Sequence, residues 1–214
     1  MKITSLKEFN AVDWSQRING NVEISANLGV IRPIKIWCTG SLLVEAGTYI
    51  EAGESIEAGW SIKAGTHIKA GTHIKAGGSI EAGESIEAGG SIEAGTYIES
   101  GTYMEAGTHI KAGWSIKAGG SIKAGTHIEA GTCGITAGLS ISCKLSLSAK
   151  FRIIAGVEPW EDGKNPDISM VTCGKLESGT VVGTLVETGL PTDQASVCQH
   201  RQTGKFCSEC GEKL

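Results

Sequence analysis

The sequence has no long apolar run and no excess of charge of one sign. No stretch approaches the ~20 apolar residues of a transmembrane helix, and the N-terminus lacks a signal-peptide pattern, so we expect a cytoplasmic protein without a membrane partner. The formal net charge is only −4, which disfavours strong nucleic-acid binding through phosphate contacts. An acidic DNA-mimicking surface is disfavoured as well, because the glutamates are interleaved with lysines.

Glycine is abundant (Gly 31), but it recurs at a fixed period. From Ile50 to Ile128 an apolar residue stands at every sixth position, with Met104 as the one substitution. Each is followed two positions later by Ala (Ser100 once) and then by Gly, and residues 42–131 read as this repeat without an insertion. A period this strict is the signature of a repeat architecture, which excludes disorder as the reason for the glycine content.

The charges of the repeat predict the length of one coil. Each unit predicts a short strand with Ile and Ala pointing inward and the Glu or Lys between them pointing outward. When outward residues eighteen positions apart are compared, ten of twelve pairs are opposite in sign, and only Glu81/Glu99 and Glu87/Glu105 are alike. At separations of twelve, twenty-four and six positions, the pairs of opposite sign are seven of thirteen, eight of eleven and four of fourteen, respectively. Facing strands favour opposite charges, so we predict three units per coil and a triangular prism.

The Ile-x-Ala-Gly spacing of residues 42–138 resembles that of the hexapeptide-repeat proteins, which fold as left-handed parallel β-helices. The resemblance implies an all-β, triangular parallel β-helix, with left-handed winding favoured. Right-handed triangular solenoids such as the bactofilins share the eighteen-residue turn and remain the alternative. Most members of known activity are acyltransferases, so transfer from an acyl-CoA is one function that the resemblance implies.

The histidines of the repeat argue against catalysis. Such acyltransferases commonly use a loop that protrudes from one coil and a histidine within the cleft, and no such loop interrupts the repeat. His67, His73, His109 and His127 all occupy the slot before the apolar residue, so none stands out as catalytic. On the eighteen-residue register His73, His109 and His127 share one face, with His109 directly below His127. A metal held across subunits, as in the γ-class carbonic anhydrases, is therefore a third and less favoured function.

Exposed aromatic residues are the better candidates for a contact surface. Trp60 and Trp114 stand at the position after Gly, which is a corner, and Gly78 above Trp60 makes room for it. Tryptophan is favoured at binding hot spots, although each ring can instead cover the neighbouring coil. The predicted partner-contact residues are Trp60, Trp114, Tyr97, Tyr103, His109 and His127.

Residues 1–40 predict an N-terminal cap and irregular first coils. Ser5 and Glu8 have the spacing of a capping box, which predicts a short helix whose Leu6 and Phe9 pack on the open end of the solenoid. Cys38 stands eighteen positions before an isoleucine of the repeat, so we expect it in the isoleucine column as a buried side chain.

Residues 139–190 predict a β cap after the repeat, which spans 41–138. The register slips by one residue at Thr132-Cys133-Gly134. Alternate residues from Leu139 to Ile153 then predict one long strand that leaves the solenoid and enters a small antiparallel sheet. We expect this sheet to cap the solenoid or to form a homo-oligomer interface.

Residues 191–214 predict a linker and a zinc knuckle. The odd number of cysteines, seven, favours a reducing compartment. Cys207 and Cys210 form a Cys-x-x-Cys-Gly turn that is similar to the second knuckle of zinc ribbons, whereas the first half is Cys-x-His. We predict structural Zn²⁺, since four protein ligands leave no open position. The predicted ligands are Cys198, His200, Cys207 and Cys210.

These features predict a non-catalytic scaffold that binds a protein partner or copies of itself. Regular solenoids also act as phage-type inhibitors of host enzymes, which makes such an inhibitor a subcase by analogy of shape.

Overall fold

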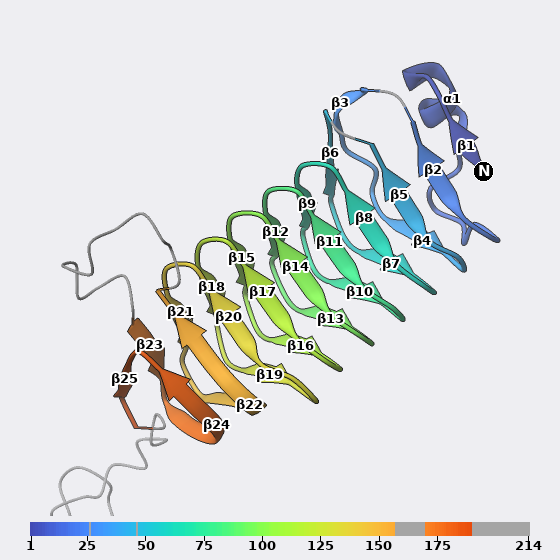
Figure 1. The fold of residues 1–214 in the computed structure, drawn as a ribbon. Coiled ribbons are helices and arrows are strands. Elements are labelled where there is room, and N and C mark those ends of the chain that lie inside the picture. Colours follow the sequence, from blue (N-terminus) through green and yellow to red (C-terminus); the bar gives the residue numbers. More distant parts are fainter. Residues whose placement is uncertain (26, 46, 157–169, 190–214) are drawn as a thin grey trace, which may run out of the picture.

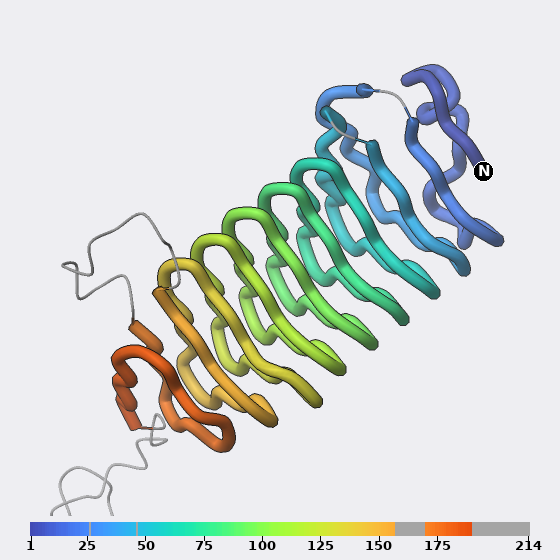
Figure 2. The backbone as a smooth tube through the Cα atoms, viewed as in Figure 1, coloured from blue at the N-terminus to red at the C-terminus, as the bar shows by residue number. Residues whose placement is uncertain are grey.

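The computed structural model describes residues 1–25, 27–45, 47–156 and 170–189. Over these residues the chain forms an all-β parallel solenoid with one short helix near the N-terminus (Figures 1 and 2). Three strands make one coil, and in the regular part each strand pairs in parallel with the strand three places further along the chain. The predicted parallel solenoid is therefore confirmed.

Three stacks of strands run along the solenoid, and β22 (Ser146–Ala155) joins the first stack to the second. Before β22, the first stack contains β4 (Ile36–Cys38), β7 (Ile56–Ala58), β10 (Ile74–Ala76), β13 (Ile92–Ala94), β16 (Ile110–Ala112) and β19 (Ile128–Ala130). The second contains β1 (Lys2–Ile3), β2 (Val22–Ile24), β5 (Leu42–Val44), β8 (Ile62–Ala64), β11 (Ile80–Ala82), β14 (Ile98–Ser100), β17 (Ile116–Ala118) and β20 (Ile135–Ala137). The third contains β3 (Gly29–Ile31), β6 (Thr48–Ala52), β9 (Ile68–Ala70), β12 (Ile86–Ala88), β15 (Met104–Ala106), β18 (Ile122–Ala124), β21 (Ile141–Cys143), β23 (Met170–Cys173) and β25 (Thr184–Glu187). The remaining strand, β24 (Lys175–Val182), lies on β22.

The eighteen-residue coil is confirmed in the regular part of the repeat. Ile50 pairs with Ile68, and Ile110 pairs with Ile128. The isoleucine and alanine columns fill the interior, where the isoleucines of the repeat are at most 1% exposed. The corners need glycine because neighbouring coils approach closely there. A Cβ atom on Gly71, for example, would lie 2.0 Å from the carbonyl oxygen of the coil below.

The first coils are longer than predicted. Leu42 pairs with Ile62, which stands twenty positions later, because two additional residues lie between β5 and β6. The repeat therefore becomes regular at Ile50 and not at residue 42. Cys38 is buried as predicted, but it pairs with Ala58 and so belongs to the alanine column, not the isoleucine column.

A short helix, α1 (Leu6–Ala11), covers the N-terminal end, as predicted. The Ser5 hydroxyl accepts a hydrogen bond from the Glu8 amide at 3.3 Å and caps the helix. Phe9 is buried against Trp14, with ring centroids 4.7 Å apart. Leu6, in contrast, is 51% exposed and does not contribute to the cap.

The prediction for the residues after the repeat was wrong in two respects. The one-residue slip is confirmed, since Ile116 pairs with Ile135. However, every pair that the structure describes beyond that point is parallel, so the chain continues the solenoid instead of forming an antiparallel sheet. The predicted long strand is two pieces on different faces: Ile141 lies in β21, whereas β22 turns a corner between Leu147 and Ile153.

Candidate functional site

The outward faces carry the predicted ladder of opposite charges. Eleven outward pairs are in register between β6 and β19, and nine of them are opposite in sign. The twelfth predicted pair is wrong, because Leu43 and not Glu45 stands beside Lys63. Six lysines reach a glutamate at 2.7–3.4 Å: Lys63–Glu81, Lys69–Glu87, Lys75–Glu93, Lys111–Glu129, Lys117–Glu99 and Lys123–Glu105.

The two like-charged pairs are each relieved by a tyrosine. Glu81 lies beside Glu99, and the Tyr97 hydroxyl donates a hydrogen bond to the Glu81 carboxylate. Burial raises the pKa of Glu81, but hydrogen bonds from Tyr97 and Lys63 outweigh it, so that the pKa lies below the ordinary value. The same hydrogen bond raises the pKa of Tyr97.

The second like-charged pair repeats this arrangement one stack away. Glu87 lies beside Glu105 and accepts from the Tyr103 hydroxyl and from Lys69. Its pKa is lowered in the same way, against the opposing effect of burial. Two of the predicted contact residues, Tyr97 and Tyr103, therefore have a structural role within the ladder.

The four histidines of the repeat all precede the apolar residue, and two of them contact a glutamate of the coil below. His73 lies 3.1 Å from Glu57, and His109 lies 3.1 Å from Glu93, in each case sixteen positions earlier in the chain. His127 stands on the coil above His109, as predicted, but Lys111 occupies its sixteenth preceding position. Within the described ranges no group of three or more His, Cys, Asp or Glu side chains could hold a metal ion.

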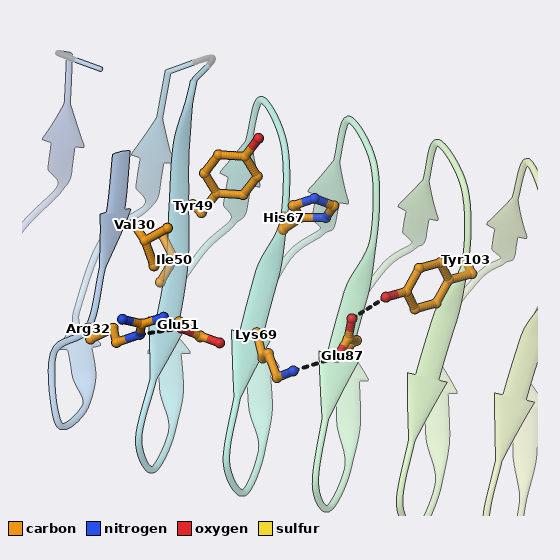
Figure 3. Close-up of a pocket in the computed structure, with 9 residues that line it drawn as sticks. All are labelled: Val30, Arg32, Tyr49, Ile50, Glu51, His67, Lys69, Glu87 and Tyr103. Carbon is orange, nitrogen blue, oxygen red and sulfur yellow. Dashed lines mark hydrogen bonds and ion pairs between the residues drawn. The ribbon is translucent and has the colours of Figure 1, made fainter. Parts of the chain in front are cut away.

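A shallow hollow of about 270 Å³ lies on the third face, over β3, β6, β9, β12 and β15 (Figure 3). At one side, the Tyr49 ring stacks on His67 with centroids 5.0 Å apart. At the other, Arg32 pairs with Glu51, and Lys69 with Glu87. His67 is itself held by Glu84 at 2.9 Å. His67 Nδ1 also lies 2.6 Å from the Ser85 hydroxyl, so that Glu84, His67 and Ser85 form a hydrogen-bonded series. Ser85 is only 1% exposed, however, so its hydroxyl is not accessible to a substrate from the hollow.

One corner of the solenoid collects exposed aromatic side chains. Consecutive backbone hydrogen bonds between coils place six residues in one line, the aromatic corner row: Trp60, Gly78, Thr96, Trp114, Cys133 and Phe151. Trp60, Trp114 and Phe151 are 70%, 56% and 60% exposed. Trp60 and Trp114 are three coils apart, or ~14 Å, and Phe151 lies two coils further, or ~10 Å, at ~4.8 Å per coil.

Sequence reasoning placed the two tryptophans on this corner but missed Phe151. We predicted that Phe151 faces the same side as Leu147 and Ile153, which are buried, whereas the turn of β22 brings it to the corner. Counting eighteen positions from Cys133, after the register slip, would have located it.

The predicted zinc ligands, Cys198, His200, Cys207 and Cys210, lie outside the described residues. The four described cysteines are free thiols. Burial raises the pKa of Cys38 to about 11 and that of Cys143 to about 12, and it also raises the pKa of Cys173. Only Cys133 among these four is exposed.

The comparisons with known proteins add no assignment. No family model, curated protein or solved structure matches the chain. Among the residues that the structure describes, no helix has the length and apolar character to cross a membrane.

Proposed function

We propose that this chain is a non-catalytic binding protein in which a rigid solenoid presents the aromatic corner row to a protein partner. The proposed solenoid is of the hexapeptide-repeat type, left-handed and triangular in section, in a cytoplasmic protein. The observation that carries the proposal is the gathering of Trp60, Trp114 and Phe151 on one corner. Large aromatic side chains left in water favour association and dominate binding hot spots.

The surroundings of the row support a protein as the partner. The aromatic rings extend over about 24 Å, which is the sum of the two spacings at ~4.8 Å per coil. The two faces beside this corner carry alternating Lys and Glu pairs, which can form the polar rim that surrounds an apolar interface centre. Tyr97, His73 and His109 each contact a glutamate carboxylate of the coil below, and these contacts add rigidity to the faces.

In this proposal the C-terminal zinc knuckle makes a second contact with the partner. Cys198, His200, Cys207 and Cys210 supply thiolates and an imidazole, which are the ligands of structural Zn²⁺. The metal would hold this short segment folded and would not take part in chemistry.

The experiment is an affinity capture from native host lysate with matched tryptophan variants. The double variant Trp60→Ala/Trp114→Ala removes two anchors, whereas Trp37→Ala removes a tryptophan that is 36% exposed and lies off the row. We expect the wild type to capture one stoichiometric partner. The double variant should bind that partner at least about tenfold more weakly, and the control should bind it as tightly as the wild type does. The reason is that anchor residues contribute more than about 1.4 kcal/mol each to the binding free energy.

Retention of the partner by the double variant would refute the role of the row. A Cys207→Ser/Cys210→Ser protein run in parallel reports separately on the knuckle. A thermal shift with saturating acyl-CoA would favour the acyltransferase function instead.

A further inference from the structure

The two ends of the solenoid differ. At the N-terminal end α1 and its buried Phe9 cover the interior. At the C-terminal end the last coil consists of β24 and β25, and in the described part of the chain each has a strand partner on one side only. Among the described residues, no further strand or helix follows β24 and β25 at this end of the solenoid (Figures 1 and 2).

Three apolar side chains continue the inward columns into this last coil, one from each face. Leu176 stands above Leu147, Val181 above Ile153 and Leu185 above Val171. The three residues below are 0% exposed, whereas Leu185 is 36% exposed and the other two are half-buried. We call Leu176, Val181 and Leu185 the end platform.

Side-chain and backbone hydrogen bonds fix the chain at this end of the solenoid. The Glu187 carboxylate turns across the coil and accepts a hydrogen bond from the Leu176 amide at 2.6 Å. The Thr188 amide and hydroxyl both donate to the Cys173 carbonyl oxygen, at 2.9 and 3.2 Å.

We propose that residues 190–214 of the same chain cover the end platform. Thr188 holds the chain on the last coil, so the segment begins at the platform itself. The segment includes four large apolar side chains: Leu190, Val197, Phe206 and Leu214. The N-terminal end provides the precedent, because there a segment of this chain buries Phe9 in the same way.

The size of the end favours this occupant over a second copy. A coil of eighteen residues in three strands, at ~3.3 Å per residue, encloses on the order of 200 Å². A stable interface between two proteins needs about 800 Å² per partner. A tethered segment needs far less area, because its effective concentration at the platform is in the millimolar range. This inference does not depend on the partner proposed for the aromatic corner row.

Trypsin treatment of the folded full-length protein tests the inference, because Arg201 and Lys205 lie in the segment. Leu185→Glu places a charge on the platform, whereas Val186→Glu is the matched control. Val186 is on the same strand, is 38% exposed, and pairs with the outward Thr172. We expect cleavage after Arg201 or Lys205 to be at least about tenfold faster in Leu185→Glu than in the wild type, with the control unchanged, since native-state cleavage follows the open population.

Other results would overturn the inference. Equal cleavage in all three proteins would mean that the segment does not dock. Equal acceleration by both substitutions would mean that protection of the segment does not depend on the platform side chain. Faster cleavage after Lys164 alone would assign the cover to residues 157–169. A wild-type dimer by light scattering that dissociates in Leu185→Glu, without faster cleavage, would assign it to a second copy.

Discussion

Removing the hydroxyls of Tyr97 and Tyr103 tests whether the tyrosines make the like-charged pairs tolerable. The variant is Tyr97→Phe/Tyr103→Phe, which keeps both rings. A hydrogen bond to a charged group contributes about 1.5–3 kcal/mol, but the acceptors Glu81 and Glu87 are 27% and 28% exposed at the side chain. Discounting for this exposure, we expect the loss of each hydroxyl to lower the free energy of unfolding by about 1 kcal/mol. The loss of both should lower it by about 2 kcal/mol, because the two sites lie on different faces and their effects add.

The assay is urea denaturation followed by far-UV circular dichroism. Tyr49→Phe is the matched control, because that ring stacks on His67 and its hydroxyl makes no hydrogen bond to the described part of the chain. We expect the control to unfold at nearly the wild-type urea concentration. A double variant that is no less stable than Tyr49→Phe would refute the reasoning.

The pH dependence provides a second check on the same variant. The pKa of Glu81 and that of Glu87 are lowered in the folded protein, so their stabilising effect is complete above the unfolded value of about 4.3. It is lost as the pH falls through the folded value. The difference between wild type and the double variant should therefore shrink below about pH 4 and be constant near neutrality. A difference that persists unchanged at about pH 2 would show that the carboxylates are not the acceptors that matter.

Three further predictions follow from the described geometry. Lys69→Glu places like charges beside Glu51 and Glu87 and should destabilise by about 1 kcal/mol more than Glu54→Lys, by urea denaturation; equal effects would contradict the ladder. Gly71→Ala puts a Cβ 2.0 Å from a carbonyl oxygen and should cost about 3 kcal/mol or more, whereas Gly53→Ala meets its nearest atom at 3.7 Å and should be tolerated, as thermal melts would show. Among the four described cysteines, Cys133 should react first with iodoacetamide at about pH 8, and Cys38, Cys143 and Cys173 only on unfolding; mass spectrometry locates the adduct, and early labelling of Cys143 would contradict its burial.

The coil length could be predicted from sequence because the repeat carries one charge per strand and cross-strand pairing is local. The same reasoning failed in the first coils for a physical reason. There Trp37 and Leu43, the outward residues that pair with Glu57 and Lys63 of the repeat, carry no charge. Gly47, with a φ of 87°, also lets the chain take two additional residues before β6.

The strand after the repeat was mispredicted because alternation cannot distinguish a straight strand from one that turns a corner. Leu147 and Ile153 are both buried, yet they lie on different faces, and the residue between them that breaks the pattern is Phe151. Alternation assigns Phe151 to the core, whereas the corner exposes it. This member of the proposed contact row was thus visible only in the structure.

The glutamates that contact the Tyr and His side chains before each isoleucine were not predicted, because they lie sixteen positions earlier in the chain and not eighteen. The residue before the isoleucine reaches diagonally, so that Tyr97, His73 and His109 each meet the glutamate at the sixteenth preceding position. Two histidines break the rule. Lys111 stands sixteen positions before His127, and His67 has Glu51 at that position but pairs with Glu84 instead. Contacts at a separation of sixteen positions therefore predict an effect of substitution that the eighteen-residue register alone does not predict.

Lys111→Glu and Lys75→Glu are a matched pair for this rule. Each removes one ion pair and creates like charges on both neighbouring strands of the first stack. Only Lys111→Glu places a carboxylate sixteen positions before a histidine, His127, whereas Lys75→Glu meets Ser91 there. We expect Lys111→Glu to be less destabilising by about 0.5–1 kcal/mol in urea denaturation at neutral pH, because a new charge-assisted hydrogen bond offsets part of the repulsion. If both variants lose the same stability, the diagonal contacts of His73 and His109 do not stabilise the solenoid.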